Sequence, residues 1–163
     1  MPIPIDENDK GYRFMKTLNE DIKLVSNEYG EYDMEFINGD IVNLTGIQSL
    51  HNAIIIAILT RYKELKHNQL YDEFGCRVHE LIKANQNNMT EFKMEKFIED
   101  TLTNMRRIRK INWIKINQIP DGYTVHFNIT SITDETVNGT VNLSWFIKKN
   151  STKKYSWKNW ILH

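Results

Sequence analysis

Three acidic residues in the middle of the chain, Asp72, Glu73 and Glu80, are of the type that a glycoside hydrolase uses. That chemistry needs two carboxyl groups at a fixed separation across a cleft, one of them with a pKa raised by burial. Here Glu73 falls in a polar connection, and Glu80 falls on an exposed part of a short predicted helix. Neither position predicts burial, so we expect no acid–base pair.

The single cysteine, Cys76, precedes His79 by three residues at a predicted helix start, so that both side chains would share one face. A thiolate at a helix N-terminus is activated as a nucleophile. A lone cysteine beside an apolar face is usually a small core residue, however, and the sequence places no Asn or Asp to orient the imidazole. We therefore predict that Cys76 packs in the core.

The chain contains no pattern that is typical of a metal or cofactor site. Its five histidines are scattered, and no HxH, HExxH or CxxC arrangement occurs. Its seven glycines are isolated, so the backbone cradle of a glycine-rich phosphate loop is missing. We expect no metal, no cofactor and no enzymatic activity.

The elements that position these residues belong to a chain of 163 residues with 40% hydrophobic residues, which suits one domain with a core. Lys+Arg and Asp+Glu both number 21, so no global charge attracts the protein to nucleic acid or membrane. No apolar run could span a bilayer, and the polar, acidic N-terminus is unlike a signal peptide. We expect a soluble protein made in a reducing compartment, in agreement with its single cysteine.

The balanced total hides basic segments. Residues 104–118 and 147–163 each contain five basic residues and no acidic one. The first of these segments could be a nucleic-acid strip around Trp113, since bases stack on aromatic side chains between phosphate contacts. Basic residues also suit the C-terminal end of a helix, and Ile108, Ile111 and Trp113 suit a strand. We favour the interpretation as a helix end followed by a strand over the nucleic-acid strip.

The hydrophobic pattern predicts an α+β domain in which a hairpin, three helices and a three-stranded antiparallel meander follow in order. The hairpin would pair residues 22–25 with 32–37. Thr45 would cap a first helix that runs to about residue 62, and a second helix of about three turns would end near residue 84. Thr90 would cap the third helix, with Phe92 and Ile98 on its buried face.

The predicted meander begins with a strand at residues 108–119 and a turn at 120–122. In the next strand, 123–131, Val125, Phe127 and Ile129 alternate with polar residues, as expected for a half-buried sheet. The third strand would place Val141, Leu143 and Trp145 on one face.

Four stretches of the chain form a recognisable pattern. They are Ser49–Ile54 (SLHNAI), Leu59-Thr60-Arg61, Tyr71–Val78 (YDEFGCRV), and a capped helix that runs into Arg107-Ile108. This pattern resembles the baseplate wedge proteins of contractile-tailed phages, a family long labelled lysozyme that initiates the tail sheath and has relatives in type VI secretion and other contractile injection systems. The resemblance covers roughly residues 39–145. Family members usually carry Glu-Pro-Arg-Ile where this chain has Met105-Arg106-Arg107-Ile108, so only the last two residues match.

The resemblance implies a fold similar to the handshake domain of sheath subunits, in which edge strands accept arms from neighbouring subunits. It divides the chain into an N-terminal arm with a short hairpin (1–38), a wedge core domain (39–146) and a basic, aromatic tail (147–163). The implied role is structural: the protein would lie in the inner baseplate of a virion tail assembled in the host cytoplasm. The implied partners are other wedge subunits, the tail sheath protein and central hub or tube proteins, without nucleic acid or membrane.

The predicted partner interface comprises Arg106, Arg107, Ile108, Tyr155, Trp157 and Trp160. Arg107 would bind carbonyl groups or a partner carboxylate at the join between helix and sheet. The tail aromatics would anchor a partner, and residues 74–76 would form a buried turn that fixes the second helix. Two alternatives stay open: a peptidoglycan-cleaving enzyme of the tail, and a nucleic-acid-binding module.

Overall fold

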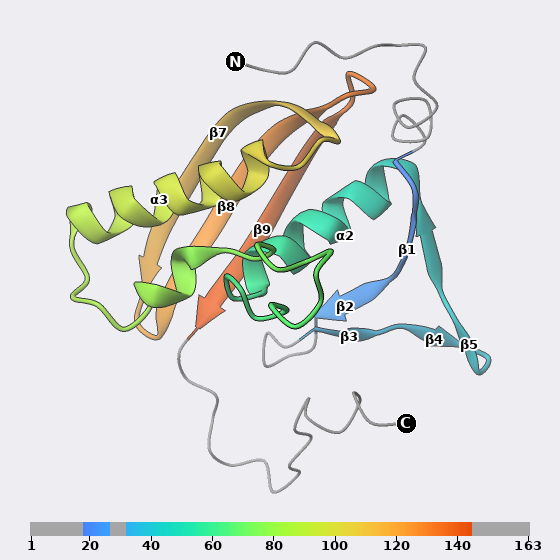
Figure 1. Ribbon diagram of the computed structural model, residues 1–163, viewed down its shortest axis with the longest axis horizontal. Coiled ribbons are helices and arrows are strands. Elements are labelled where there is room, and N and C mark those ends of the chain that lie inside the picture. The colour runs from blue at the N-terminus through green and yellow to red at the C-terminus, as the bar shows by residue number, and fades with distance from the viewer. Residues whose placement is uncertain (1–17, 27–31, 145–163) are drawn as a thin grey trace, which may run out of the picture.

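The computed structural model describes residues 18–26 and 32–144. Within these ranges the chain forms short N-terminal hairpins, two α-helices and a C-terminal three-stranded antiparallel meander (Figure 1). The α+β class, the N-terminal hairpin and the C-terminal meander are therefore confirmed. The predicted tail at 147–163 and the first 17 residues of the predicted arm lie outside the described residues.

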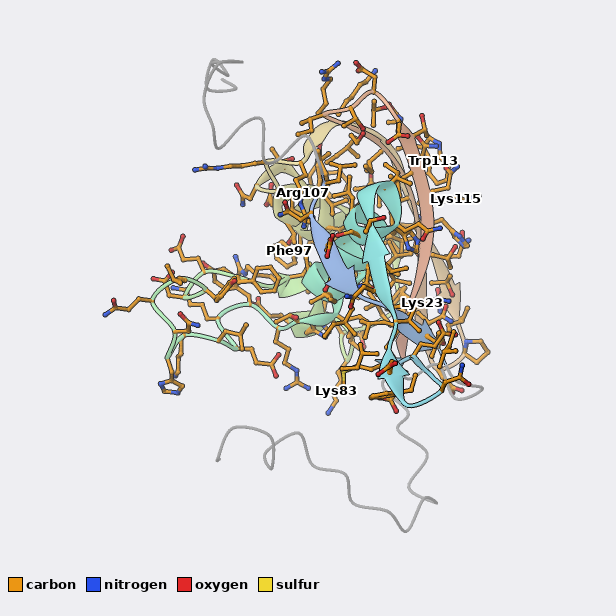
Figure 2. The ribbon with its side chains drawn as sticks, turned by 90° about the vertical axis from the view of Figure 1, so that its right-hand side faces the viewer. Lys23, Lys83, Phe97, Arg107, Trp113 and Lys115 are labelled. Carbon is orange, nitrogen blue, oxygen red and sulfur yellow. The ribbon has the colours of Figure 1, made fainter. Side chains whose placement is uncertain are left out.

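The three-stranded sheet is built around its central strand. Strands β7 (Ile108–Ile119), β8 (Gly122–Ser131) and β9 (Thr136–Ser144) pair in the order β7-β8-β9. Buried residues alternate along β8 with polar ones, as predicted, because the described part of the chain covers one face of the sheet. Helices α2 (Gly46–Leu59) and α3 (Asn88–Thr103) pack on that face, against β9 and β7 respectively (Figure 1). Trp113 and Lys115 lie on the opposite face (Figure 2).

Strand β7 does not alternate strictly, because its register with β8 shifts twice. The shifts fall between Ile108 and Lys110 and between Ile111 and Trp113, so Arg109 and Asn112 are the extra residues. Each bulge places two consecutive exposed residues on the strand. At the bulges, Arg109 contacts Asp134 and Ile132, and Asn112 contacts Asn128 and Thr130.

The two α-helices were placed correctly, and one of the two predicted N-caps, Thr45, is confirmed in position. Thr45 occupies the N-cap position of α2, although its side chain makes no capping hydrogen bond. In α3 the N-cap is Asn87, whose side chain accepts from the Thr90 N–H at 2.9 Å, so the prediction of Thr90 as the cap was wrong by three residues. The buried face of α3 follows a four-residue spacing from Thr90 through Ile98, which leaves Phe92 55% exposed.

The predicted second helix of about three turns was wrong. The segment is a 3₁₀-helix, η1 (Arg77–Glu80), followed by turns in which Leu81 and Ala84 donate to carbonyls three residues earlier. The preceding residue, Cys76, is already fixed because its N–H donates to the Thr60 carbonyl at 2.8 Å. A helix nucleus is costly, and this short, constrained stretch cannot offset that cost with many hydrogen bonds.

The N-terminal region contains three small ladders where one hairpin was predicted. Pairing of β2 (Leu24–Ser26) with β3 (Tyr32–Met34) confirms the hairpin. Two further pairs were missed: β4 (Phe36–Ile37) with β5 (Asp40–Ile41), and β1 (Glu20–Ile22) with β6 (Asn43–Thr45).

The three ladders meet at Lys23, Glu35 and Val42. The Lys23 N–H donates to the Val42 carbonyl at 2.8 Å, the Val42 N–H donates to the Glu35 carbonyl at 3.1 Å, and the Glu35 N–H donates to the Lys23 carbonyl at 3.0 Å. These three residues form a closed ring of backbone hydrogen bonds, which we call the strand junction. It satisfies backbone groups at the point where all three ladders end.

Candidate partner-binding groove beside strand β9

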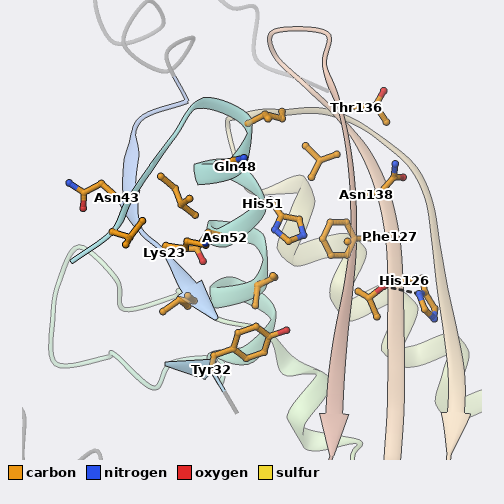
Figure 3. A pocket seen from close by; sticks show the side chains of 18 of the residues that line it. Lys23, Tyr32, Asn43, Gln48, His51, Asn52, His126, Phe127, Thr136 and Asn138 are labelled. Carbon is orange, nitrogen blue, oxygen red and sulfur yellow. Dashed lines mark hydrogen bonds between the residues drawn. The ribbon is translucent and has the colours of Figure 1, made fainter. Parts of the chain in front are cut away.

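A broad groove runs between the edge of β9, helix α2 and the N-terminal strands (Figure 3). One wall is formed by five consecutive β9 residues, Thr136 to Thr140. The floor comes from α2, and the second wall comes from strands around the strand junction. The floor includes Gln48, His51 and Asn52 of α2, and the second wall includes Lys23, Leu24 and Asn43.

The backbone of β9 forms an open edge along this groove. Among the described strands, β9 pairs with β8 alone. The Ser131 N–H donates to the Glu135 carbonyl at 2.9 Å, and the pairs that follow continue in the same register. Because bonded and non-bonded pairs alternate in an antiparallel ladder, the N–H and C=O groups of Thr136, Asn138 and Thr140 point away from β8. These are the groups that an added strand would pair with.

The groove has an aromatic ring beneath its β9 wall. Phe127 and Gly139 are directly paired, and a Cβ atom at Gly139 would lie 2.1 Å from the ring of Phe127. The missing side chain of Gly139 therefore provides the space that the ring occupies. The His51 ring lies against it, with ring centroids 6.1 Å apart (Figure 3). Burial lowers the pKa of His51, so the imidazole is uncharged at neutral pH.

Helix α2 and strand β1 are held together by Asn52. This residue is 3% exposed, and its side-chain N–H groups donate to the Asp21 carboxylate and to the Ile22 carbonyl, both at 2.9 Å. A buried amide with satisfied donors fixes the position of both elements. The second wall of the groove is therefore attached firmly to its floor.

Arg106, Arg107 and Ile108, the predicted interface residues at the join between helix and sheet, differ in burial and in contacts. Arg107 is half-buried, its Nη1 donates to the Leu18 carbonyl at 3.0 Å, and burial lowers its pKa. Arg106 is exposed, whereas Ile108 packs partly buried against the core. Arg107 thus connects the join to the chain segment before β1. The other predicted interface residues, Tyr155, Trp157 and Trp160, lie outside the described residues.

The basic run that suggested nucleic-acid binding is partly used inside the chain. Arg109 forms an ion pair with Asp134 and donates to the Ile132 carbonyl at 3.0 Å. Arg107 binds Leu18, as described above. Arg106 and Lys110 are exposed, and neither forms an ion pair with another of the described residues. The geometry does not arrange the run as a continuous basic strip.

Two of the stretches that carry the family resemblance pair with each other. The Cys76 N–H donates to the Thr60 carbonyl, the Tyr62 N–H donates to the Cys76 carbonyl at 3.1 Å, and Arg61 forms a parallel bridge with Cys76. Gly75 has a φ of +107°, and a Cβ there would lie 2.4 Å from the Arg61 carbonyl oxygen. Only glycine fits this close approach. The turn at 74–76 is therefore fixed against the end of α2.

The candidate catalytic groups lie in environments that do not activate them. Arg77 binds the Glu80 carboxylate through two hydrogen bonds of 3.0 Å, and this contact lowers the pKa of Glu80, whereas a general acid needs a raised one. Asp72 and Glu73 are exposed. Cys76 is fully buried, as predicted, and burial raises the pKa of its thiol, which disfavours the thiolate.

His79 has a structural contact rather than a catalytic one. Its Nε2 lies 3.0 Å from the Ile58 carbonyl. Because a carbonyl oxygen can only accept, Nε2 carries the proton and donates to the last turn of α2. Within the described residues, no group of three or more His, Cys, Asp or Glu side chains could hold a metal ion. In the same part of the chain, no helix is long and apolar enough to cross a membrane.

Sequence reasoning missed the groove. Two signals could have indicated it: polar Gln48, His51 and Asn52 interrupt a mostly apolar helix, and Gly139 interrupts a strand of alternating residues. A glycine inside a strand often marks a close approach of another group. Neither signal alone says that the two segments face each other.

The comparisons with known proteins identify a shared fold. No protein-family model matches the chain, and no curated protein sequence matches it. Among solved structures, it is similar to the crystal structure of a protein described as a candidate tail lysozyme from Geobacter sulfurreducens, with a TM-score of 0.52 and 15% sequence identity. The similarity covers 60% of this chain and 88% of that one. At this level of identity, the chain shares a fold with that protein.

Proposed function

We propose that this protein is a structural component of a contractile tail, in which it lies in the inner baseplate wedge and accepts a strand from a neighbouring subunit along β9. By this contact it joins wedge subunits and provides the template for the first ring of the tail sheath. The observation that carries the proposal is the open edge of β9 beside a groove. The fold shared with a protein described as a tail lysozyme, and the resemblance of residues 39–145 to baseplate wedge proteins, support the tail context.

Strand addition explains why the groove has its particular lining. An incoming strand would lie about 4.8 Å from β9 and pair with the outward backbone groups of Thr136, Asn138 and Thr140. Its side chains would alternate between two surroundings. One set would face Phe127 and Ile55, and the other would face the polar side of the sheet. The favoured partner is therefore an arm with alternating apolar and polar residues.

The proposal assigns no catalytic role to this chain. Glu80, one of the candidate acids of a hydrolase, has its pKa lowered by the hydrogen bonds from Arg77, which is opposite to what a general acid needs. Two observations argue against the nucleic-acid alternative. Arg109 forms an ion pair with Asp134, and the half-buried Arg107 donates to the Leu18 carbonyl of the same chain. A structural role requires neither feature.

The test is a proline that blocks the edge without disturbing the ladder to β8. The Thr140 N–H points away from β8, so Thr140→Pro removes a donor that an added strand would use and that no described strand uses. The matched control, Thr140→Ala, keeps this N–H and removes the side-chain methyl group and the hydroxyl that contacts His126. Particles from a producing strain that carries each variant would be imaged by electron microscopy.

We expect Thr140→Pro particles to have tubes without extended sheaths, while Thr140→Ala particles have normal tails. Circular dichroism of the purified variants confirms that both fold. Normal sheathed tails with Thr140→Pro would overturn strand addition. In a strain that lacks the protein altogether, complete particles that fail only at the cell wall would overturn the structural role.

A further inference from the structure

The face of the sheet opposite the helices carries almost only polar side chains. We call it the outer face. It is defined by the residues Lys110, Asn112, Trp113, Lys115, Asn117, Thr124, His126, Asn128, Thr130, Thr136, Asn138, Thr140 and Asn142. The members from β7 and β9 are exposed, and those from β8 are half-buried between them. The outer face thus presents a broad polar surface with one tryptophan.

Hydrogen bonds between side chains hold the outer face in one arrangement. The Asn112 amide donates to Asn128 at 2.5 Å and to Thr130 at 3.0 Å, and the Asn128 amide donates to Asn138 at 2.5 Å. A chain of amides therefore crosses all three strands. Side chains that are already ordered lose little conformational entropy when a ligand binds. This surface is organised before any ligand arrives.

Trp113 is the exception to this polar composition. Its side chain is 49% exposed, and it lies in the same row as Asn128 and Asn138. Trp113, His126, Asn138 and Thr140 also line the groove beside β9. A large apolar ring beside amides, a hydroxyl and an imidazole matches a pyranose sugar, which has an apolar C–H face and a rim of hydroxyl groups.

The charges of the outer face select among sugars. Lys110 and Lys115 belong to it, and none of its defining residues is acidic. A lysine ammonium is a compact charge that donates to a carboxylate. The surface therefore favours a glycan that carries carboxylates over a neutral one.

We propose that the outer face binds an anionic glycan of the uronic-acid type. Trp113 stacks on one sugar ring, the amides of Asn128 and Asn138 bind its hydroxyl groups, and Lys115 binds a carboxylate. This site uses side chains of the outer face, whereas strand addition uses outward backbone groups of β9, so separate variants test the two proposals and either can fail without the other. A single-stranded nucleic acid fits less well, because it is bound through bases stacked on several aromatic side chains, whereas the outer face has one indole, Trp113, and one half-buried imidazole, His126.

The test measures binding of the full chain by isothermal titration calorimetry. Three probes are compared: a hexamer of galacturonic acid, the neutral maltohexaose and an oligothymidylate. We expect the anionic hexamer to bind most tightly. Trp113→Ala should weaken its binding by about ten-fold or more, the usual effect of losing an aromatic stacking contact. Trp113→Tyr, which keeps an aromatic plane, should stay within a few-fold of the original affinity.

Two further variants test whether binding depends on the outer face itself, rather than on any exposed aromatic residue of the protein. Phe92→Ala removes an equally exposed aromatic from α3, on the helical side of the sheet, and should leave the affinity unchanged. Lys115→Gln should weaken binding of the galacturonate hexamer only. The proposal is overturned if the hexamer does not bind, if Trp113→Ala and Trp113→Tyr both bind like the original chain, or if maltohexaose binds equally well. Tighter binding of oligothymidylate, lost in Trp113→Ala, would replace the glycan by a nucleic acid.

Discussion

Lys23 and Glu35 are joined twice, once through their backbones and once through their side chains. The Glu35 N–H donates to the Lys23 carbonyl at 3.0 Å, and the Lys23 Nζ lies 2.6 Å from the Glu35 Oε2. Both residues belong to the strand junction, where the three N-terminal ladders end. The ion pair therefore lies where it can hold the second wall of the groove in place.

Replacing Lys23 by Met should lower the free energy of unfolding by about 1 kcal/mol or less, because both side chains are partly exposed and water screens the pair. Urea unfolding monitored by circular dichroism would measure this change. The matched control is Lys96→Met, which breaks the Lys96–Glu99 pair on one turn of α3. A smaller effect is expected there, since no junction depends on it. Equal effects would show that the Lys23–Glu35 pair has no special role.

Gly75→Ala should destabilise the protein strongly. The new Cβ would lie 2.4 Å from the Arg61 carbonyl oxygen, which belongs to a hydrogen-bonded backbone and cannot rotate away. Gly39 is the matched control, because its φ of +88° is also positive but nothing lies within 4 Å of its Cβ position. Gly39→Ala should cost about 1 kcal/mol from backbone strain alone, and Gly75→Ala clearly more. Similar thermal midpoints for the two variants would contradict the close approach.

The extent to which the sequence predicts this fold depends on the length of each element. Strand β8 was predictable because Val125, Phe127 and Ile129 alternate with polar residues over a full strand. The short pair β2–β3 was found through the turn-forming residues 27–30 that separate its strands in the sequence. The ladders β4–β5 and β1–β6 were missed because strands of two or three residues have no periodicity of their own. They are held by backbone hydrogen bonds at the strand junction, and backbone bonds leave no pattern in the side chains.

The candidate site was predicted less well for a related reason. Arg107 was singled out from the chain, but its partner, the Leu18 carbonyl, is a backbone group distant in sequence. The groove combines His51 of α2 with Gly139 of β9, and only the tertiary fold brings these together. The outer face likewise depends on the register of three strands. Motif reasoning identifies residues, whereas the surfaces they form depend on nonlocal packing.

Gly139→Ala should destabilise the sheet through Phe127. The Cβ would lie 2.1 Å from the ring, so the ring must move out of its place. Overpacking of this kind costs about 1–3 kcal/mol. Phe127→Leu makes space at the same point, so the double variant should lose less stability than the sum of the single variants. Urea unfolding of all four proteins measures this coupling, and strictly additive losses would contradict the contact.

Acidification should destabilise the protein through His51 and His79. Burial is the main cause that lowers the pKa of both below the ordinary value of 6.5. As the pH falls through 6.5, the unfolded chain binds protons before the folded one does, so the free energy of unfolding decreases. Above pH 6.5 both histidines are mainly uncharged in the unfolded chain too, so their lowered pKa values no longer change the free energy of unfolding with pH. The double variant His51→Gln, His79→Gln should show a flatter dependence between about pH 7.5 and 5.5; an unchanged slope would assign the effect to other groups.

Arg107→Met tests whether this arginine acts inside the chain or at a partner interface. Within the chain, its guanidinium donates to the carbonyl of Leu18, a residue that is 1% exposed. Loss of a charged hydrogen bond in this half-buried place should lower the free energy of unfolding by about 1–2 kcal/mol. Amide hydrogen exchange should become faster in residues 18–22, which the contact holds, while β8 keeps its protection. Arg106→Met, at the exposed neighbour, is the control and should change neither quantity. If Arg107→Met leaves the stability and exchange of the isolated protein unchanged but prevents assembly of tails, the guanidinium serves a partner and the contact with Leu18 is secondary.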